Sequence, residues 1–228
     1  ENVGGDLNAY TNKEETVLYA SFLTEDLDRA VELMSDMVFH STFPDHELDK
    51  EKEVILDEIQ SYEDNPSELI FDDFEDMIFK DHSLGRNILG NPQSLNQITR
   101  EDIIRFWSNY YQPSNMVFFV LGNVDFKKVI RLAEKYTGHL TLSDRISERI
   151  MPPLYVPQHK LIHKETHQAH VMVGNRGYDA HNNKRTGLYL LNNMLRGPAM
   201  HSRLTVPLGE VKGLVYSVDS NFRSAPCY

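Results

Sequence analysis

The chain has 228 residues and a formal net charge of -11, with 40% hydrophobic residues and one cysteine. The negative charge argues against nucleic acid or an anionic membrane surface as the main partner. No apolar run approaches the ~18 residues that a membrane-spanning helix needs, and one cysteine excludes an internal disulfide framework. We therefore expect a globular protein without a membrane span. A reducing compartment, with the cytoplasm favoured, fits the cysteine count.

The first half of the chain predicts a strand pair followed by helices. Residues 7–23 are rich in Tyr, Thr, Val and Leu around a polar turn at 12–14, which is typical of a hairpin. Thr24 is a candidate cap for the first helix. Thr99, with Asp102 three residues later, predicts a capping box. Residues 81–98 contain glycines and a proline and predict an irregular connection. The predicted helices cover 25–39, 45–62, 67–79 and 99–110.

The second half predicts a linker and a second domain. A continuous apolar strand at 115–121 precedes a helix at 125–136 that Gly138 ends. Proline-rich residues 141–158 predict a linker between a first domain at 1–140 and the start of a second at 159–228. In that second domain we expect strands at 159–163, 168–174 and 213–220 and a helix at 184–195. This order predicts the α+β class, with an antiparallel sheet and helices packed on one face.

The helix predicted over 45–62 contains the sequence EKEVILDEIQ, with Glu51 and Glu58 seven residues apart. Seven residues are almost two helical turns, so both carboxylates lie on nearly the same side, with Val54 and Ile55 between them. One carboxylate on such a face can bind a metal ion while the other supports it. From spacing alone, however, a solvated acidic helix surface is favoured over a metal role.

The ten histidines contain neither HExxH nor HxxEH, the two spacings that place a pair of imidazoles on one helical face. The nearest similar stretch, HKETHQAH, carries His163, His167 and His170 in a segment predicted as strand and turn. We expect no helical zinc motif there. No GxSxG elbow or phosphate-binding loop is present either, and Cys227 has no defined histidine partner.

Several ordered blocks resemble the insulinase/pitrilysin family of zinc peptidases, which includes the mitochondrial processing peptidases. The first blocks are GGDLNAYTNKEETVLYA at residues 4–20 and ELDKEKEVILDEI at residues 47–59. DHSLGRNILG at 81–90 and NYYQPSNMVFFVLGNVD at 109–125 are similar to the family's following segments. KETHQAHVMVG at 164–174 and SRLTVPLGEVKGLVYSV at 202–218 are similar to the start of its second, homologous domain. The resemblance covers nearly the whole chain.

The resemblance implies a zinc site completed by an upstream HxxEH helix that is absent from this chain. It implies that Glu58 is a zinc ligand and that Glu51 supports the site without binding the metal. It also implies that the strand carrying Asn8, Ala9 and Tyr10 binds a substrate peptide as an added strand at a sheet edge. It implies the same role for Thr11.

In the second domain, the resemblance assigns substrate binding to Tyr216, whereas the position of the family's partner arginine holds Gly209. Since HxxEH is missing, we expect these residues alone to hold no catalytic zinc and to cleave no peptide. The expected complete protein is a zinc metalloendopeptidase acting on oligopeptides or unfolded segments, with a second homologous domain or subunit as partner. The alternatives are a non-catalytic family member that binds peptides or has a structural role, and an acidic binding module unrelated to peptidases.

Overall fold

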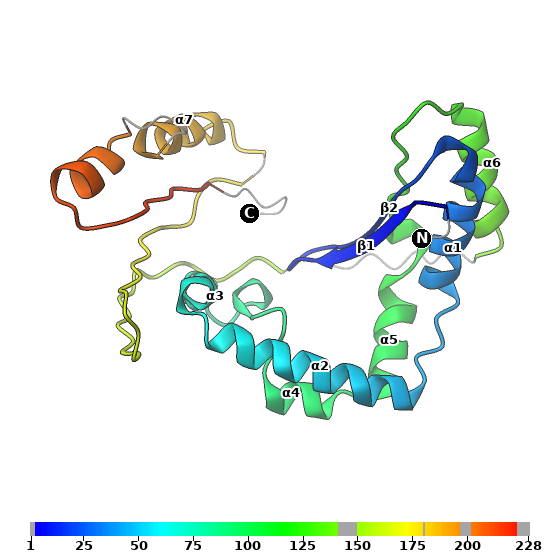
Figure 1. Ribbon diagram of the computed structural model, residues 1–228, viewed down its shortest axis with the longest axis horizontal. Coiled ribbons are helices and arrows are strands. Elements are labelled where there is room, and N and C mark those ends of the chain that lie inside the picture. Colours follow the sequence, from blue (N-terminus) through cyan, green and yellow to red (C-terminus); the bar gives the residue numbers. More distant parts are fainter. Residues whose placement is uncertain (1–2, 141–149, 180, 197–201, 223–228) are drawn as a thin grey trace. The chain divides into compact units, whose positions relative to one another are not determined.

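A computed structural model describes residues 3–140, 150–179, 181–196 and 202–222. The chain divides into two compact units, each described by itself. The first unit comprises residues 1–73 and 86–147, and the second comprises residues 74–85 and 148–228. The helices and the strand pair are shown in Figure 1. None of the helices within the described ranges combines the length and the hydrophobicity needed to span a lipid bilayer.

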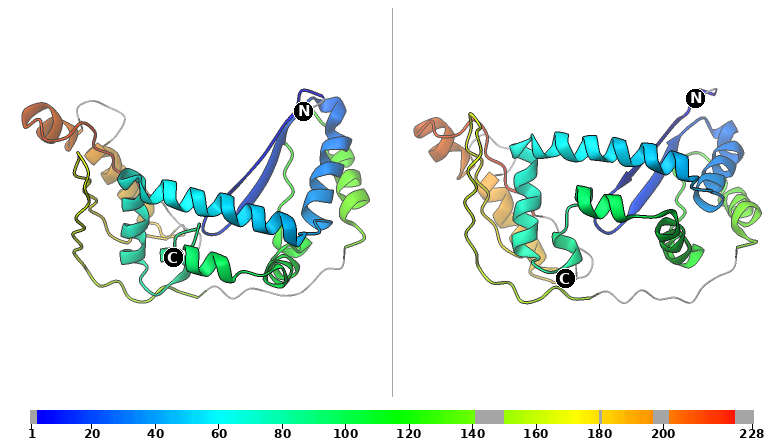
Figure 2. Two further views of the ribbon diagram at one scale, coloured as in Figure 1. Left: turned by 60° about the horizontal axis from the view of Figure 1, so that its bottom comes forward. Right: turned by 90° about the horizontal axis from the view of Figure 1, so that it is seen from below.

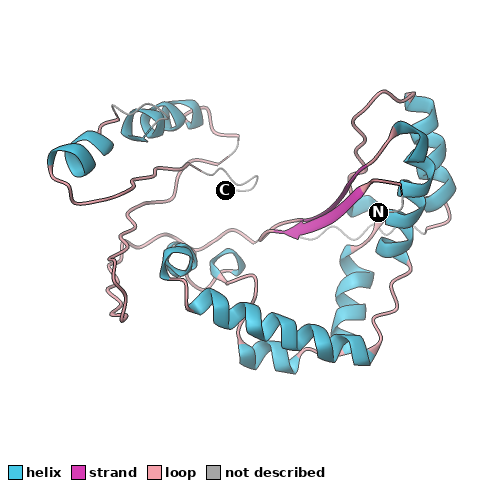
Figure 3. Ribbon diagram, viewed as in Figure 1, coloured by secondary structure: helices cyan, strands magenta, loops and turns pink. Residues whose placement is uncertain are grey.

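The hairpin predicted near the start of the chain is formed by β1 (Asp6–Thr11) and β2 (Thr16–Ser21), which pair antiparallel with Asp6 opposite Ser21. They are the only strands in the part of the chain that the structure describes (Figure 3). Asn12 organises the turn, because its Oδ1 accepts hydrogen bonds from the backbone N–H groups of Glu14 and Glu15 at 2.8 and 2.9 Å. The α+β class is confirmed, with helices predominating.

The core of the first unit lies between α1 (Leu27–Phe39) and α6 (Phe126–Thr137). Leu27, Val31 and Leu132 are buried there, and apolar side chains that are partly buried pack around them: Phe22, Val120, Val124 and Tyr136. Since Phe22 directly follows β2, the core also anchors the base of the hairpin. Burying apolar area in this way is the main favourable contribution to folding.

A polar network at the rim of this core joins the same two helices. The Tyr136 hydroxyl donates to Asp28 Oδ1 at 2.8 Å, and Lys135 Nζ lies 3.2 Å from the same oxygen. The hydrogen bond from Tyr136, followed by that from Lys135, lowers the pKa of the Asp28 carboxyl. Hydrogen bonds to Tyr136 and Asp28 raise the pKa of Lys135. The network therefore favours the charged forms of both groups.

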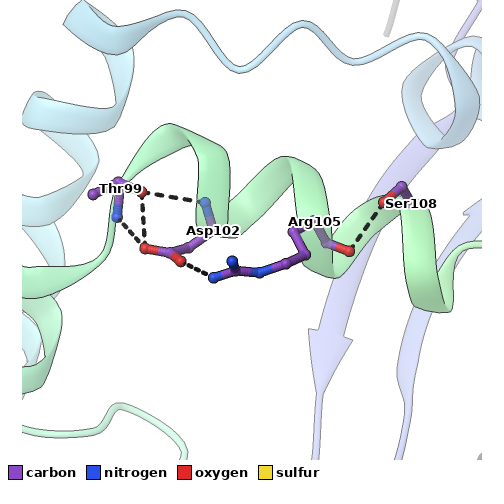
Figure 4. Close-up of polar contacts among 4 residues, drawn as sticks. All are labelled: Thr99, Asp102, Arg105 and Ser108. Atoms are coloured by element: carbon purple, nitrogen blue, oxygen red, sulfur yellow. Dashed lines mark hydrogen bonds and ion pairs between the residues drawn. The ribbon is translucent and has the colours of Figure 1, made fainter.

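The remaining helices of the first unit are α2 (Asp45–Glu63), the start of α3 (Pro66–Ile78), α4 (Pro92–Gln97) and α5 (Arg100–Tyr110). Figure 2 shows α4 lying alongside α2. Thr99 and Asp102 form the predicted capping box of α5, with Thr99 N–H donating to Asp102 Oδ2 at 2.9 Å (Figure 4). Two hydrogen bonds from Thr99 lower the pKa of the Asp102 carboxyl. The bond from the Thr99 backbone N–H has the larger effect, and the bond from its hydroxyl comes second.

The second unit contains the end of α3, then α7 (Arg185–Arg196) and a π-helical turn at Val206–Val211. Arg176 holds two of its segments together. Its Nε and Nη2 donate to the Ile78 carbonyl at 3.1 and 2.6 Å, and Nη1 donates to Pro153 O at 2.5 Å. The guanidinium also lies over the rings of Phe79 and Tyr155. One side chain therefore satisfies a helix-end carbonyl and fixes the segment after residue 150.

Several predicted elements differ from the structure. The segments at 115–121, 159–163, 168–174 and 213–220 form no strands, because a strand needs a hydrogen-bonded neighbour and none is found among the described residues. Thr24 does not cap α1, since a 3₁₀ turn at Thr24–Asp26 comes first. The connection at 81–98 contains α4, which Asn91 and Ser94 cap reciprocally. The first half of the predicted linker, 141–149, lies outside the described residues.

Candidate functional site

One stripe of α2 carries the two predicted acids on the solvent side. Glu51, Val54 and Glu58 are all exposed. Ile59 is buried, and Lys52, which lies on the same side of the helix, donates from Nζ at 2.6 Å to the carbonyl of Ile98, the C-cap of α4. Packing of that side explains why the acidic stripe faces outward. The predicted common face of Glu51 and Glu58 is therefore present and accessible.

The side chains of Glu51 and Glu58 form no hydrogen bond or ion pair with the described part of the chain. This distinguishes them from Glu47 on the same helix, which pairs with Lys50 at 3.0 Å. A carboxylate without a competing partner fits the ligand chemistry of zinc, which accepts carboxylate oxygen together with histidine nitrogen. Glu58 could thus supply one ligand.

Further ligands do not converge on Glu58 from the described residues. Within those ranges, no group of three His, Cys, Asp or Glu side chains is arranged to hold a metal ion. His163, His167 and His170 are exposed, and they belong to the second unit. A complete zinc site around Glu58 would therefore need ligands from residues beyond those described.

Strand β1 has one edge open to a further strand. The Asn12 N–H donates to Glu15 O at 2.9 Å, and hydrogen-bonded pairs alternate in antiparallel strands, so Asn8 and Tyr10 bond with β2. Leu7, Ala9 and Thr11 then direct their N–H and C=O groups away from β2. No described strand pairs with that edge. The geometry suits an incoming extended peptide.

The side chains along β1 are exposed, including those of Asn8, Ala9 and Tyr10. Asn8 Oδ1 accepts a hydrogen bond from the outward N–H of Ala9 at 2.8 Å. A peptide that paired with Ala9 would compete with this side chain for the same donor. Tyr10 and Tyr19 lie on one face of the hairpin with ring centroids 6.2 Å apart. The predicted peptide-binding residues of β1 are thus all accessible.

The second-unit candidates lie close to each other in the chain. Tyr216 is 99% exposed, and Gly209 lies in the π-helical turn that precedes it. The N–H of Gly213 donates to the Gly209 carbonyl at 3.1 Å. A side chain at Gly209 would meet the Val215 carbonyl only at 3.7 Å, an ordinary contact. Neither space nor backbone conformation therefore requires glycine at this position.

The candidate residues do not coincide with a closed cavity. A hollow of about 210 Å³ in the first unit lies between the end of α1 and α5, and Phe43 and Trp107 contribute to its aromatic lining. It contains none of the predicted zinc or peptide ligands. The candidate site is instead an open helix face and an open strand edge, both of which an extended substrate can reach.

Two family models match the chain over most of its length. Residues 1–92 match the model described as Insulinase (Peptidase family M16), and residues 97–226 match the model described as Peptidase M16 inactive domain. The chain is 37% identical over 221 residues to the uncharacterized zinc protease YmxG of Bacillus subtilis, covering 96% of this chain and 53% of that protein. It is also 37% identical over 144 residues to the β subunit of the yeast mitochondrial-processing peptidase, covering 63% of this chain and 31% of that subunit.

Solved structures agree on the fold. A peptidase M16 inactive domain from Pseudomonas fluorescens matches with a TM-score of 0.82 at 20% identity, over 98% of this chain and 55% of that one. A protease from Helicobacter pylori matches with a TM-score of 0.74 at 21% identity, over 93% and 53% of the two chains. The chain thus spans about half the length of the relatives that match it along nearly all of its residues. On these matches, the chain belongs to the insulinase family of peptidases, M16.

Proposed function

We propose that these residues are part of a zinc-dependent endopeptidase that hydrolyses oligopeptides or unfolded protein segments. The observation that carries the proposal is the accessible stripe of α2, where Glu51 and Glu58 lie together without partners among the described residues. Relatives that match almost the whole chain bear the name zinc protease, which supports the same activity. Bound zinc would polarise a water molecule for attack on a peptide carbonyl.

In this proposal Glu58 binds zinc through its carboxylate, and Glu51 supports the site from the same helix face. The remaining ligands are two histidines and the general base is a glutamate, all from an HxxEH helix outside this sequence. We infer that the 228 residues alone hold no catalytic zinc and cleave no peptide. Tight one-to-one zinc binding by this chain in a titration would contradict that inference.

We propose that β1 binds the substrate as an added strand. The outward N–H and C=O groups of Leu7, Ala9 and Thr11 are available for main-chain hydrogen bonds. Main-chain pairing requires an extended peptide but little side-chain identity, so the expected substrates are flexible peptides rather than folded domains. Asn8 would give up its bond to the Ala9 N–H when the peptide binds, while Tyr10 would contact substrate side chains.

A second candidate function is a non-catalytic subunit that binds or presents peptides. Gly209 favours it, because the family's arginine would donate to a peptide carbonyl and glycine has no side chain to do so. Tyr216 remains available in the same segment. In either function we expect a second homologous domain or subunit to complete the peptide-binding chamber.

The test is a comparison of Glu58→Gln with Glu53→Gln in the complete protein. Glu53 is an exposed acid on the same helix and has no assigned role. We expect the wild-type protein and Glu53→Gln to hold one zinc per active site and to cleave a fluorogenic unfolded peptide, with cleavage abolished by a chelator. Glu58→Gln should lose both properties. If the wild-type protein neither binds zinc nor cleaves peptides, the hypothesis of a non-catalytic subunit is favoured instead.

A further inference from the structure

The turn of the β1–β2 hairpin contains a lysine that is unusually well covered. Asn12 fixes the loop by accepting hydrogen bonds from the N–H groups of Glu14 and Glu15. Lys13 follows Asn12 at the corner of this turn, yet its side chain is only 17% exposed. A lysine in a hairpin turn normally extends into water, and lysine is seldom covered unless it is paired.

Lys13 pairs with Asp72 on α3, which is itself only 21% exposed. Lys13 Nζ lies 3.5 Å from Asp72 Oδ1, and Asn87 Nδ2 donates to Asp72 Oδ2 at 2.9 Å. Both carboxylate oxygens are therefore engaged. Asn87 is oriented in turn, because its Oδ1 accepts the Leu89 N–H at 2.8 Å. All these residues belong to the first unit.

The helix that carries Asp72 is fixed to the helix that carries Glu58. The Asn65 carbonyl, between α2 and α3, accepts the N–H groups of Glu68 and Leu69 at 3.1 and 3.0 Å. The Tyr62 hydroxyl, one helical turn after Glu58, donates to the Glu68 carbonyl at 3.1 Å. A continuous series of bonds thus runs from the hairpin turn through α3 to α2, and Figure 2 shows the turn extending toward these helices.

We propose that Lys13, Asp72 and Asn87 form a clamp that positions the peptide-binding strand β1 relative to the metal-ligand helix α2. The proposal rests on the functions proposed above for β1 and Glu58. Residues of the clamp contact neither zinc nor substrate, so they are positioning residues. Their role is to hold the open edge of β1 at the distance and angle from Glu58 at which a bound peptide reaches the metal.

The clamp has the electrostatic properties that such a role needs. A pair covered to this extent is screened by salt less than an exposed pair. Removal of one partner takes this pairing away from a charge that stays covered, which is more disruptive than removal of both. The pair between Lys50 and Glu47 on α2 provides a matched contrast, because its side chains are 67% and 54% exposed. Exposed pairs of that kind contribute little.

The experiment compares Lys13→Met, Asp72→Asn, the double variant and Lys13→Arg in the complete protein, with Glu47→Gln as control. We expect the two single variants to lower kcat/KM for a long unfolded peptide by about three- to tenfold, with zinc content unchanged. The double variant should be no worse than either single variant, and Lys13→Arg should retain activity because it keeps the charge. Glu47→Gln should behave as wild type.

Amide hydrogen exchange of residues 6–21 provides a second readout that needs no enzymatic activity. We expect faster exchange in Lys13→Met and Asp72→Asn than in wild type and Glu47→Gln. Unchanged exchange in both single variants overturns the clamp, as does a loss of kcat/KM equal to that of Glu47→Gln. If the wild-type protein lacks zinc and peptidase activity, the proposed function fails, and the exchange data still decide whether the clamp exists.

Discussion

Replacement of Leu27 tests whether α1 and α6 pack together in the first unit. It is 1% exposed and packs with Val31 and Leu132 between α1 and α6. Leu33 lies on the same helix but is 52% exposed. Replacing each leucine by alanine removes the same atoms, and alanine is at least as good a helix former as leucine, so a loss of stability at Leu27 alone reports burial.

The magnitude follows from the burial of Leu27. A fully buried leucine replaced by alanine costs about 2.7–5 kcal/mol of unfolding free energy, because a cavity remains where the side chain packed. With an m-value of about 1–3 kcal/mol per molar urea, the unfolding midpoint should fall by roughly 1–5 M. Leu33→Ala should change the unfolding free energy by no more than about 0.5 kcal/mol, as is typical of surface positions.

The assay is urea unfolding of the chain followed by the fluorescence of Trp107, its single tryptophan. The indole N–H of Trp107 donates to the Val38 carbonyl near the end of α1 at 2.7 Å, so the signal reports the helix that is perturbed. Equal midpoints for Leu27→Ala and Leu33→Ala would refute the reasoning. They would mean that α1 and α6 do not form a packed core in solution.

Two further predictions concern charge. The lowered pKa of Asp28 means that its stabilisation is present above the unfolded carboxyl pKa of about 3.9 and is lost as the pH falls through the lower, folded value. Asp28→Asn should therefore be less stable than wild type at pH 7 in thermal unfolding, with the difference vanishing in strong acid, whereas exposed Asp49→Asn should show no difference. Gly209→Arg should fit without loss of stability and lower KM for an unfolded peptide roughly tenfold in the complete protein, as one charge-assisted bond of about 1.5 kcal/mol would do. Gly187→Arg, which also places the new side chain in open space, is the control. Equal KM values for the two variants would contradict the assignment of position 209 as the position of the family's arginine.

The local elements of the fold were predictable from the sequence because their signals are local. The helix bounds follow apolar periodicity and breakers such as Asn65-Pro66, and the capping box at Thr99 and Asp102 needs only residues three apart. The hairpin was predicted from residue types, although the role of the Asn12 side chain in shaping its turn was not. Asn91 at the start of α4 is a similar capping signal, which was overlooked between Gly90 and Pro92.

The strands predicted from apolar runs failed for a non-local reason. Residues 115–121 have strand composition, and Val120 packs against the core, but Val117 and Leu121 are 92% and 88% exposed. Composition indicates that a segment is suited to a sheet, while a strand forms only when a neighbour pairs with it. The predicted domain bounds and the favoured cytoplasmic location remain predictions.

Only part of the candidate site was predictable from the sequence, for a related reason. Spacing placed Glu51 and Glu58 on one face, and the structure exposes both. The pairing of Lys13 with Asp72, however, joins residues 59 positions apart in the chain, and no sequence pattern relates them. Long-range pairs of this kind are visible only once the helices and the hairpin are folded.

The acidic residues discussed above differ in whether their side chains form hydrogen bonds within the folded chain. Asp28, Asp72 and Asp102 each accept hydrogen bonds that join or cap elements, so their presence is explained by the structure. Glu51 and Glu58 make no such bonds among the described residues, and their helix would pack equally well with glutamine at either position. Their placement on one accessible stripe fits the zinc-ligand role proposed for Glu58 and the supporting role proposed for Glu51. Gly209 is likewise free of any folding requirement, so the choice between a peptidase and a peptide-binding subunit depends on whether histidines approach Glu58.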